Sequence, residues 1–490
     1  MSDIGQPEMV TQVKVVKLFV DTLGYNYLGD WRDRENNSNV EEKYLKEYLA
    51  KQGYDSELIE KAINEFAKKV TGQAKSLYDK NKEIYNLLRY GLKIKTSVGE
   101  IYQTIYFIDW KNPENNHFAI ASEVTIKGID GADKRPDLIL YVNGIALAII
   151  ELKRSTVSVV EGIRQNLDNQ NKKFIQHFFS TIQFVLAGNE TESLRYGTIE
   201  TKEKYFLTWK EENTENDENK QSNQLESQLR QLCDKKRFLE LIHDFIVFDS
   251  GTKKICRHNQ YFGVKHAQNF IKEKKGGIIW HTQGSGKSIT MVWLAKWIRE
   301  NQNISRILII TDRTELDEQI ERIFNGVDEE IYRTQSGHDL ITQLNDSRHS
   351  IICSLIHKFG SKDEDVSIDE FIEDMNKSLP NDFIPKGNLF VFVDECHRTQ
   401  SGKLHQAMKS ILPEALFIGF TGTPILAKDK VKSTQIFGSY IHTYKFDEAI
   451  KDGASKPVNN LSTTINNFIL LGSLINLFCI SISKLLRLPV

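Results

Sequence analysis

The spacing of hydrophobic residues changes along the chain, and these changes predict where helices give way to strands. Between residues 40 and 95, apolar side chains recur three and four positions apart, which is typical of amphipathic helices. Between residues 98 and 153 they form short β-branched runs, which are typical of strands. After Lys275, short apolar runs alternate with helical segments, and this alternation indicates a parallel sheet flanked by helices. The apolar positions that mark the first helices are Leu45, Leu49, Leu58, Ile63 and Phe66.

Four runs in the middle segment are predicted strands, and one polar run is a predicted connection. The strands read YQTIYFIDW, SEVTIKG, DLILYV and IALAIIEL. Residues 209–230 are polar and nearly free of apolar side chains, which favours either an exposed loop or a linker between domains.

Composition limits the class of protein. The chain has 490 residues, 40% of them hydrophobic and 27% charged, and its formal net charge is −2. A protein that coats DNA by bulk charge would be basic, so any DNA-binding surface here must be local. The five cysteines form no C-x-x-C pair, which argues against a zinc ribbon and favours a reducing, cytoplasmic compartment. No signal peptide is recognisable, and the apolar run at 468–482 is shorter than the roughly 20 residues of a membrane span, so we expect no membrane association.

A glycine-rich loop after Lys275 predicts a nucleotide-binding site. The strand GGIIW is followed by the loop HTQGSGKS at 281–288 and then by the apolar helix ITMVWLAKWI. In this context backbone N–H groups cradle phosphate oxygens, Lys287 contacts the β- and γ-phosphates of ATP, and the Ser288 hydroxyl joins the coordination of Mg²⁺. His281 stands where the full pattern has glycine, but the core of the pattern is intact. The residues expected to bind ATP are Thr282, Gln283, Gly284, Ser285, Gly286, Lys287 and Ser288.

An acidic pair ends a second apolar run, NLFVFV. At the end of a strand, Asp394 can hold Mg²⁺ through water, and Glu395 can orient the water that attacks ATP. Taken alone, a structural acidic pair at a strand end is the alternative. With a P-loop upstream, the sequence Asp-Glu-Cys-His resembles the DEAD-type box of superfamily 2 helicases and translocases.

Other segments follow in the order of that family. Residues 307–313 and 351–358 resemble its DNA-backbone contacts, and residues 419–424 resemble the segment that couples hydrolysis to DNA movement. Gln260 lies where the family often has an adenine-reading glutamine, although a lone glutamine is more often a surface residue.

Asp137, Glu151 and Lys153 predict a nuclease site. Glu151 and Lys153 are two positions apart in a strand, so their side chains share a face. Burying these charges within an apolar run is unfavourable unless a metal ion binds there or the two side chains pair with each other. Asp137 and Glu151 could bind Mg²⁺, while Lys153 orients the water or neutralises the transition state. Asp-x(13)-Glu-x-Lys resembles the PD-(D/E)xK nuclease motif. A hairpin with a strand-end charge pair is the structural alternative.

The hairpin register tests this prediction. An ideal two-residue turn at Asn143-Gly144 would pair Asp137 with Ile150 and put it on the wrong face. The metal site therefore requires an odd-length loop or a bulge, which we expect between Val142 and Ala146.

A PD-(D/E)xK nuclease before a superfamily 2 motor resembles the restriction (R) subunit of type I restriction–modification enzymes, over residues 10–457. The stretches GIRQNLDNQ and AGNETESLRYG also agree with that family. The resemblance implies double-stranded DNA as substrate, with methyltransferase (M) and specificity (S) subunits as partners. In the family a glutamine, with a tyrosine four positions later, supports the nuclease: Gln165 fits, whereas Asn169 replaces the tyrosine and receives no role.

The expected fold is α/β in two domains: a nuclease domain (1–240, core about 98–200) and a first RecA-like motor lobe (241–457). The family implies a second lobe with an arginine finger, for which this chain offers no candidate. Residues 458–490 differ from the charged sequence before them, which suggests a frameshift or premature stop. Two alternatives stay open: a truncated chain that cannot translocate DNA, and a stand-alone helicase–nuclease.

Overall fold

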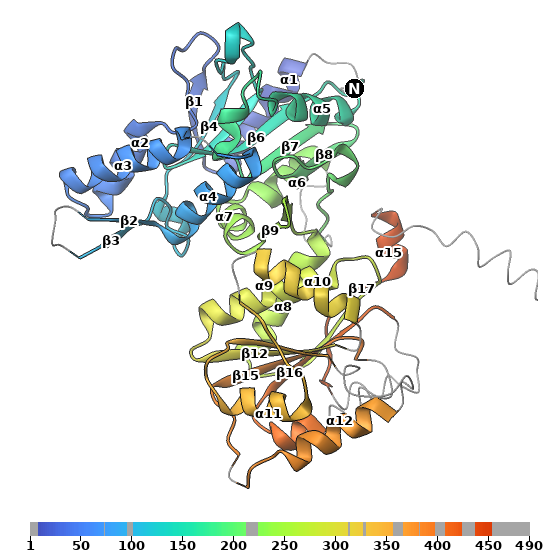
Figure 1. The fold of residues 1–490 in the computed structure, drawn as a ribbon. Helices are drawn as coiled ribbons and strands as arrows, with labels where there is room; N and C mark the ends of the chain where they lie inside the picture. Colours follow the sequence, from blue (N-terminus) through green and yellow to red (C-terminus); the bar gives the residue numbers. More distant parts are fainter. Residues whose placement is uncertain are drawn as a thin grey trace, which may run out of the picture.

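The computed structural model describes residues 8–72, 74–95, 101–211, 224–311, 314–326, 330–355, 366–381, 383–396, 407–423 and 437–452. They form two α/β bodies, one above the other in Figure 1, each built around its own sheet. No helix among the described residues is long and apolar enough to cross a bilayer. The apolar run at 468–482 lies outside the described residues.

The predicted N-terminal helices are confirmed. They begin at side-chain caps where the sequence supplies them: Asp55 accepts from the Leu58 N–H and Ser76 from the Asp79 N–H. The apolar positions that marked these helices are all buried. The predicted helices are α2 (Glu42–Lys51), α3 (Ser56–Thr71) and α4 (Leu77–Tyr90). A further helix that was not predicted, α1 (Glu8–Lys17, continued by a π-helix at Leu18–Thr22), precedes them.

The N-terminal sheet is mixed, with six strands in the order β1-β4-β5-β6-β7-β8. The helix α5 (Val159–Asn169) packs on β6 and β7. A separate hairpin joins β2 (Leu92–Ile94) and β3 (Gln103–Ile105). The six strands are β1 (Asn26–Asp30), β4 (Phe118–Ser122), β5 (Leu138–Val142), β6 (Ile145–Leu152), β7 (Phe184–Asn189) and β8 (Ser193–Gly197).

Three expectations about this region were wrong in detail. Only Gln103–Ile105 of YQTIYFIDW is a strand. Of SEVTIKG, Ser122 ends β4 and Ile126 forms an isolated bridge with Lys134, because Glu123 adopts a left-handed φ of 52° that ends the strand. The polar run at 209–230 is not all loop, because its end belongs to α6 (Gln224–Cys233), which buries Leu225 and Leu229.

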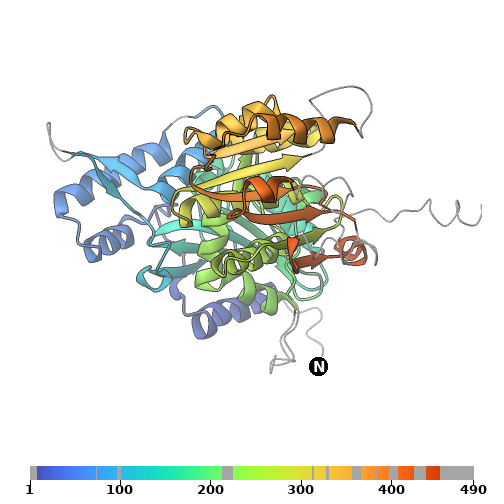
Figure 2. The ribbon, with the colours of Figure 1, turned by 90° about the horizontal axis from the view of Figure 1, so that it is seen from below.

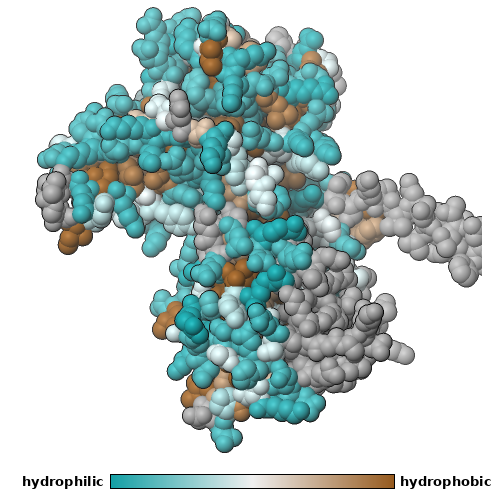
Figure 3. Space-filling view, in the orientation of Figure 1, coloured by the Kyte–Doolittle hydropathy of each residue, from teal (hydrophilic) through white to brown (hydrophobic). Residues whose placement is uncertain are grey.

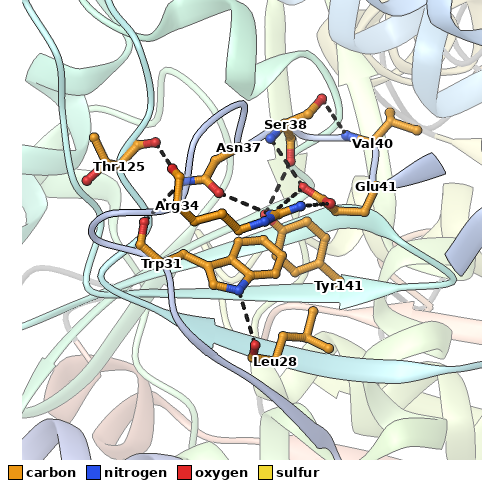
Figure 4. A network of polar contacts seen from close by, with 9 residues as sticks. All are labelled: Leu28, Trp31, Arg34, Asn37, Ser38, Val40, Glu41, Thr125 and Tyr141. Atoms are coloured by element: carbon orange, nitrogen blue, oxygen red, sulfur yellow. Dashed lines mark hydrogen bonds and ion pairs between the residues drawn. The ribbon is translucent and has the colours of Figure 1, made fainter. Parts of the chain in front are cut away.

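A polar network fastens the loop after β1 to the sheet (Figure 4). The Arg34 guanidinium lies 3.8 Å from the centre of the Trp31 ring and forms an ion pair with Glu41. Asn37 donates to the carbonyl oxygens of Trp31 and Thr125. The loop therefore covers one face of the sheet and shields its core from solvent.

Two helices and a hairpin join the bodies: α6, α7 (Lys235–Asp244), β9 (Ile246–Asp249) and β10 (Thr252–Ile255). Trp209 is fully buried here, with its ring near Tyr196 of the first sheet and Tyr261 of the second body. One cluster of mutually contacting hydrophobic side chains contains residues of both bodies, from Val15 of α1 to Ile441 of β17. The two bodies therefore share a core rather than meeting at a loose linker.

The second body is the predicted parallel sheet, in the order β13-β14-β12-β15-β16-β11-β17. The helices α8 (His258–Lys272), α9 (Lys287–Asn301) and α10 (Thr314–Gly326) lie on the side facing the first body, whereas α11 (Gly337–Asn345) and α12 (Val366–Lys377) cover the other (Figures 1 and 2). A short helix, α15 (Phe446–Lys451), follows the last strand. The strands are β11 (Gly277–His281), β12 (Ser305–Thr311), β13 (Tyr332–Arg333), β14 (Ile351–Leu355), β15 (Asn388–Val393), β16 (Leu416–Thr421) and β17 (Tyr440–Tyr444).

Candidate active sites

The β5–β6 hairpin contains the bulge that the nuclease prediction required. Asn143 and Gly144 form a two-residue turn with φ of 51° and 82°, and Tyr141 pairs with Ala146. The register then shifts, so that Leu140 pairs with Ala148 and Leu147 is the extra residue. The bulge lies just beyond Ala146, slightly further from the turn than we expected. Continuing the shifted register places Asp137 opposite Glu151, on one face of the sheet.

The two carboxylates meet in a buried place at the end of the hairpin. Asp137 Oδ2 accepts a hydrogen bond of 2.6 Å from the Leu152 N–H. Glu151 is fully buried. Burial, opposed in part by Lys153, raises the pKa of Asp137 to about 6. Burial and the neighbouring Asp137 raise the pKa of Glu151 well above its usual range. Without a cation, this pair therefore binds a proton more tightly than two separate, exposed carboxylates would.

Lys153 lies beside both carboxylates and is also held by the first helix. Its Nζ donates to Glu8 Oε1 at 2.9 Å and to the Leu152 carbonyl at 2.8 Å. Burial lowers the pKa of Lys153, but Asp137 and Glu8 outweigh it and raise the pKa above its ordinary value. Gln12, one turn after Glu8, donates to the Asp137 carbonyl at 3.0 Å. Neither Glu8 nor Gln12 was predicted from the sequence, because more than 120 positions separate them from their partners.

One residue that was given no role lies at the site. Asn169, at the end of α5, is buried and its Nδ2 lies 3.4 Å from Glu151 Oε1. Gln165, the residue expected to support the nuclease, is half-buried on the same helix, and no hydrogen bond joins it to a described residue. Helical spacing from Gln165 was the available signal for Asn169, which was set aside because it is not tyrosine.

The residues at this site fit a divalent cation. Two carboxylates and a carboxamide supply the hard oxygen ligands that Mg²⁺ prefers. Glu151 Oε2 and Asn169 Oδ1 are both buried, and no described residue forms a hydrogen bond with either atom. A bound cation would satisfy these oxygens and would remove the proton that the carboxylate pair otherwise retains.

The glycine-rich loop has the backbone of a phosphate cradle. Gly284 and Gly286 adopt left-handed φ angles of 84° and 86°, which side-chain-bearing residues rarely adopt. The helix α9 begins at Lys287, so its N-terminal N–H groups face the loop. A backbone hydrogen bond closes a turn within the loop, in which the Ser285 N–H donates to the Thr282 carbonyl at 3.2 Å. Gln283 is exposed, whereas Ser288 is largely buried beneath the loop.

The acidic pair and the predicted coupling segment converge on the same loop. Asp394 and Glu395 follow β15, and Glu395 has a left-handed φ of 46°. Glu395 Oε2 accepts from the Gly422 N–H at 3.4 Å. A Cβ added at Gly422 would lie 2.7 Å from Lys287 Nζ, so Lys287 and Glu395 both lie close to Gly422. A left-handed backbone conformation is unfavourable for a residue other than glycine, and it is typical of turns at functional sites.

Gln260 contacts the loop rather than solvent. Its Nε2 donates to the Gly286 carbonyl at 3.0 Å, and its Oε1 accepts from the Arg257 N–H at 2.8 Å. His281, at the missing glycine, is buried, and its Nε2 lies 2.8 Å from His442 Nδ1 on β17. The departure from the pattern is therefore accommodated by a neighbouring strand. Of the other predicted motif positions, Asp312, Arg313, residues 356–358, His397 and Pro424 lie outside the described residues.

Comparison with known protein families agrees with this division. Residues 6–205 match the family described as type I restriction enzyme R protein N terminus, and residues 259–471 match the family described as SWI2/SNF2 ATPase. The first body of the chain is thus similar to R-protein N-terminal domains, and the second is similar to SWI2/SNF2 ATPase domains. The residues between the two matches, 206–258, contain the α6–β10 junction.

Curated relatives of this two-domain chain are named endonuclease subunits. The type I restriction enzyme HindI endonuclease subunit of Haemophilus influenzae is 29% identical over 444 residues, which cover 82% of this chain and 40% of the relative. The type I restriction enzyme SauCOLORF180P endonuclease subunit of Staphylococcus aureus is 27% identical over 365 residues, covering 72% of this chain and 37% of the relative. The chain thus spans about two fifths of the length of these relatives.

Among solved structures, a nuclease-deletion mutant of the Type ISP restriction-modification enzyme LlaGI in complex with a DNA substrate mimic is 17% identical. The match covers 44% of this chain and 22% of that chain, with a TM-score of 0.30.

Proposed function

We propose that this chain is an endonuclease and ATP-dependent translocase subunit of a type I restriction enzyme, which cuts double-stranded DNA away from the recognition site. The observation that carries the proposal is the β6 bulge at Leu147, because it brings Asp137, Glu151 and Lys153 to one face of a sheet. The P-loop, its acidic pair and the shared core that joins the two bodies support the motor half of the proposal.

In the nuclease, Asp137 and Glu151 would hold Mg²⁺, with Asn169 Oδ1 available as a neighbouring oxygen. Mg²⁺, when bound, supplies an activated water and neutralises charge on the phosphate. Lys153 would hold a water in place through its ammonium group and stabilise negative charge on the phosphate oxygens. Glu8 positions Lys153 through its ion pair, and Gln12 positions the strand end that carries Asp137.

In the motor, Lys287 would contact the terminal phosphates of ATP, while Ser288 and Asp394 would hold Mg²⁺. Glu395 would orient the attacking water, and its contact with Gly422 links that position to the predicted coupling segment. Gln260 would read the adenine from its place against the loop. In this proposal the chain works with M and S subunits, which would supply the recognition of the DNA sequence.

The test is Mg²⁺-dependent cleavage of linear duplex DNA by the purified chain, with Lys153→Ala as the variant and Lys61→Ala as the matched control. Lys61 is an exposed lysine of α3 paired with Glu57. We expect cleavage by the parent chain and the control, and its loss in Lys153→Ala. If the parent is inactive alone, the assay is repeated with ATP and the M and S subunits. Absence of cleavage in that reconstituted mixture, or equal cleavage by Lys153→Ala, would contradict the proposal.

A further inference from the structure

Three lysines lie near the nuclease site, and none of them forms an ion pair with an acidic residue that the structure describes. Lys134 Nζ lies 3.8 Å from the centre of the Phe174 ring, and Lys173 Nζ lies 4.5 Å from the same centre. Lys172 and Lys173 are exposed, and Lys134 is half-buried. We call Lys134, Lys172, Lys173 and Phe174 the lysine rim.

The backbone ties the lysine rim to the catalytic residues. Lys134 precedes Asp137 by three positions and is fixed by paired hydrogen bonds with Ile126. On the other side, the Ile175 N–H donates to the Asn169 carbonyl at 3.2 Å, and Asn169 reaches Glu151. The rim residues therefore stand on the two chain segments that carry Asp137 and Asn169, and two of them, Lys172 and Lys173, are exposed.

Neighbouring cations differ from the lysine rim because they have acidic partners within the described part of the chain. Lys127 pairs with Asp133 at 2.8 Å, and Arg164 pairs with Glu203 at 2.9 Å. Among the residues that the structure describes, none forms an ion pair with Lys134, Lys172 or Lys173. Two ammonium groups held beside one aromatic ring repel each other, and an anion placed between them would remove that repulsion.

The surface beside the rim suits an extended polar ligand. Lys172 and Lys173 line an open hollow of about 600 Å³ together with Asn171 and Gln176. One N–H of each of these two amide groups donates to a backbone carbonyl, which fixes the amide and leaves its second N–H for a ligand. Glu200 is the acidic residue among its lining residues, and burial raises the pKa of its carboxyl. Ammonium and amide groups are those that bind phosphodiester oxygens in DNA.

We propose that the lysine rim binds phosphates of the duplex next to the bond that is cut. This inference rests on the proposed nuclease and deepens it, because it names the surface that guides DNA to Asp137 and Glu151. The contact is with the backbone, so it would be independent of base sequence and sensitive to salt.

Cross-linking tests the rim directly in the full chain. Lys172→Cys is made in a Cys479→Ser background, since the other four cysteines are buried, and is labelled with an azidophenacyl group. Lys61→Cys on α3, treated identically, is the matched control. We expect cross-linking of linear duplex from position 172 to exceed that from position 61 at least about fivefold, in Ca²⁺ to prevent cleavage. Equal cross-linking from the two positions would overturn the proposal.

Binding measurements provide the second test. In fluorescence anisotropy with the same duplex, Lys134→Gln/Lys173→Gln should lower the salt slope of log K by about 2, one for each lost phosphate contact. Lys46→Gln/Lys61→Gln, which removes two lysines paired with glutamates, should leave the slope unchanged. An unchanged slope in the rim variant would overturn the proposal. If the rim variant loses DNA binding but the parent chain never cuts DNA, the proposed nuclease is refuted and the rim proposal stands. If the parent chain cuts DNA and the rim variant binds DNA normally, the rim proposal is refuted and the nuclease stands.

Discussion

The two candidate sites use different geometry to gather charged residues. In the motor, Lys287, Glu395 and Gly422 follow three different strands of a parallel sheet, and all three strands end at the same edge. In the nuclease, Asp137 and Glu151 come from two antiparallel strands, and their meeting depends on one extra residue in β6. Strand ends of a parallel sheet converge in any register, whereas a hairpin shifted by one residue separates its side chains onto opposite faces.

The two sites also differ in their exposure to solvent. The tip of the phosphate loop, Gln283 and Gly284, is exposed to solvent at the sheet edge. The described surface of the lower body is mostly hydrophilic in the view of Figure 3. The nuclease carboxylates are enclosed by α1 and α5, so burial raises both of their pKa values. The nuclease site should therefore respond strongly to metal and pH, and the motor site mainly to the loss of a phosphate contact.

The largest effect is expected at the enclosed site. Glu151→Gln removes one carboxylate from the pair, and we expect DNA cleavage to fall on the order of 10³-fold, because metal-assisted hydrolysis loses a ligand. Calorimetric titration with Mn²⁺ should lose the nuclease binding event while ATP binding by the motor stays unchanged. Cleavage close to that of the parent chain would show that the two carboxylates do not act together.

A pH titration separates the sites next. The folded-state pKa of Asp137, about 6, exceeds its ordinary value of 3.8, so the metal-free folded chain binds the proton more tightly than the unfolded chain. Stability then falls as pH rises from about 4 to about 6, by about 3 kcal/mol for this residue. Urea unfolding in EDTA should show this loss in the parent chain and not in Asp137→Asn. If the free energy of unfolding depends on pH equally in the parent chain and in Asp137→Asn, the raised pKa of Asp137 is contradicted.

At the open site, Lys287→Ala removes one charged contact with the terminal phosphates. A hydrogen bond to a charged group contributes about 2–3 kcal/mol, so we expect binding of a fluorescent ATP analogue to weaken about 100-fold. Metal-dependent cleavage of a short duplex should be unaffected, because the nuclease has its own cation site. Weakened Mn²⁺ binding at the nuclease in this variant would mean that the two sites are not separate.

The smallest effect tests the connection between the bodies. Arg89 of α4 is almost fully buried and pairs with Glu300 of α9, so it joins the nuclease to the motor. Arg89→Ala should lower the free energy of unfolding by about 2 kcal/mol. This loss is smaller than that caused by breaking a fully buried ion pair, because Glu300 is partly exposed. Urea denaturation measures this, with Glu57→Gln at an exposed helix pair as the control expected to change it by less than about 0.5 kcal/mol.

The sequence predicted the motor better than the nuclease for a physical reason. The runs GIIW and NLFVFV became buried strands ending next to the glycine loop and the acidic pair, because short apolar runs before polar turns are local signals. The run IALAIIEL is buried on both faces, so its pattern cannot tell which side chains share a face. The need for a bulge could be deduced from the turn, but its place at Leu147 could not.

What the sequence determined alone was therefore the order of the elements, the two domain types, and the candidate residues for binding phosphate or metal. Only the tertiary structure decided that Glu8 holds Lys153, that Asn169 reaches Glu151, and that the lysine rim forms beside them. These contacts join segments far apart in the chain, and no local spacing specifies them. They arise because α1 and α5 pack against the strand end that carries the carboxylates, and packing follows the shape and burial of whole elements.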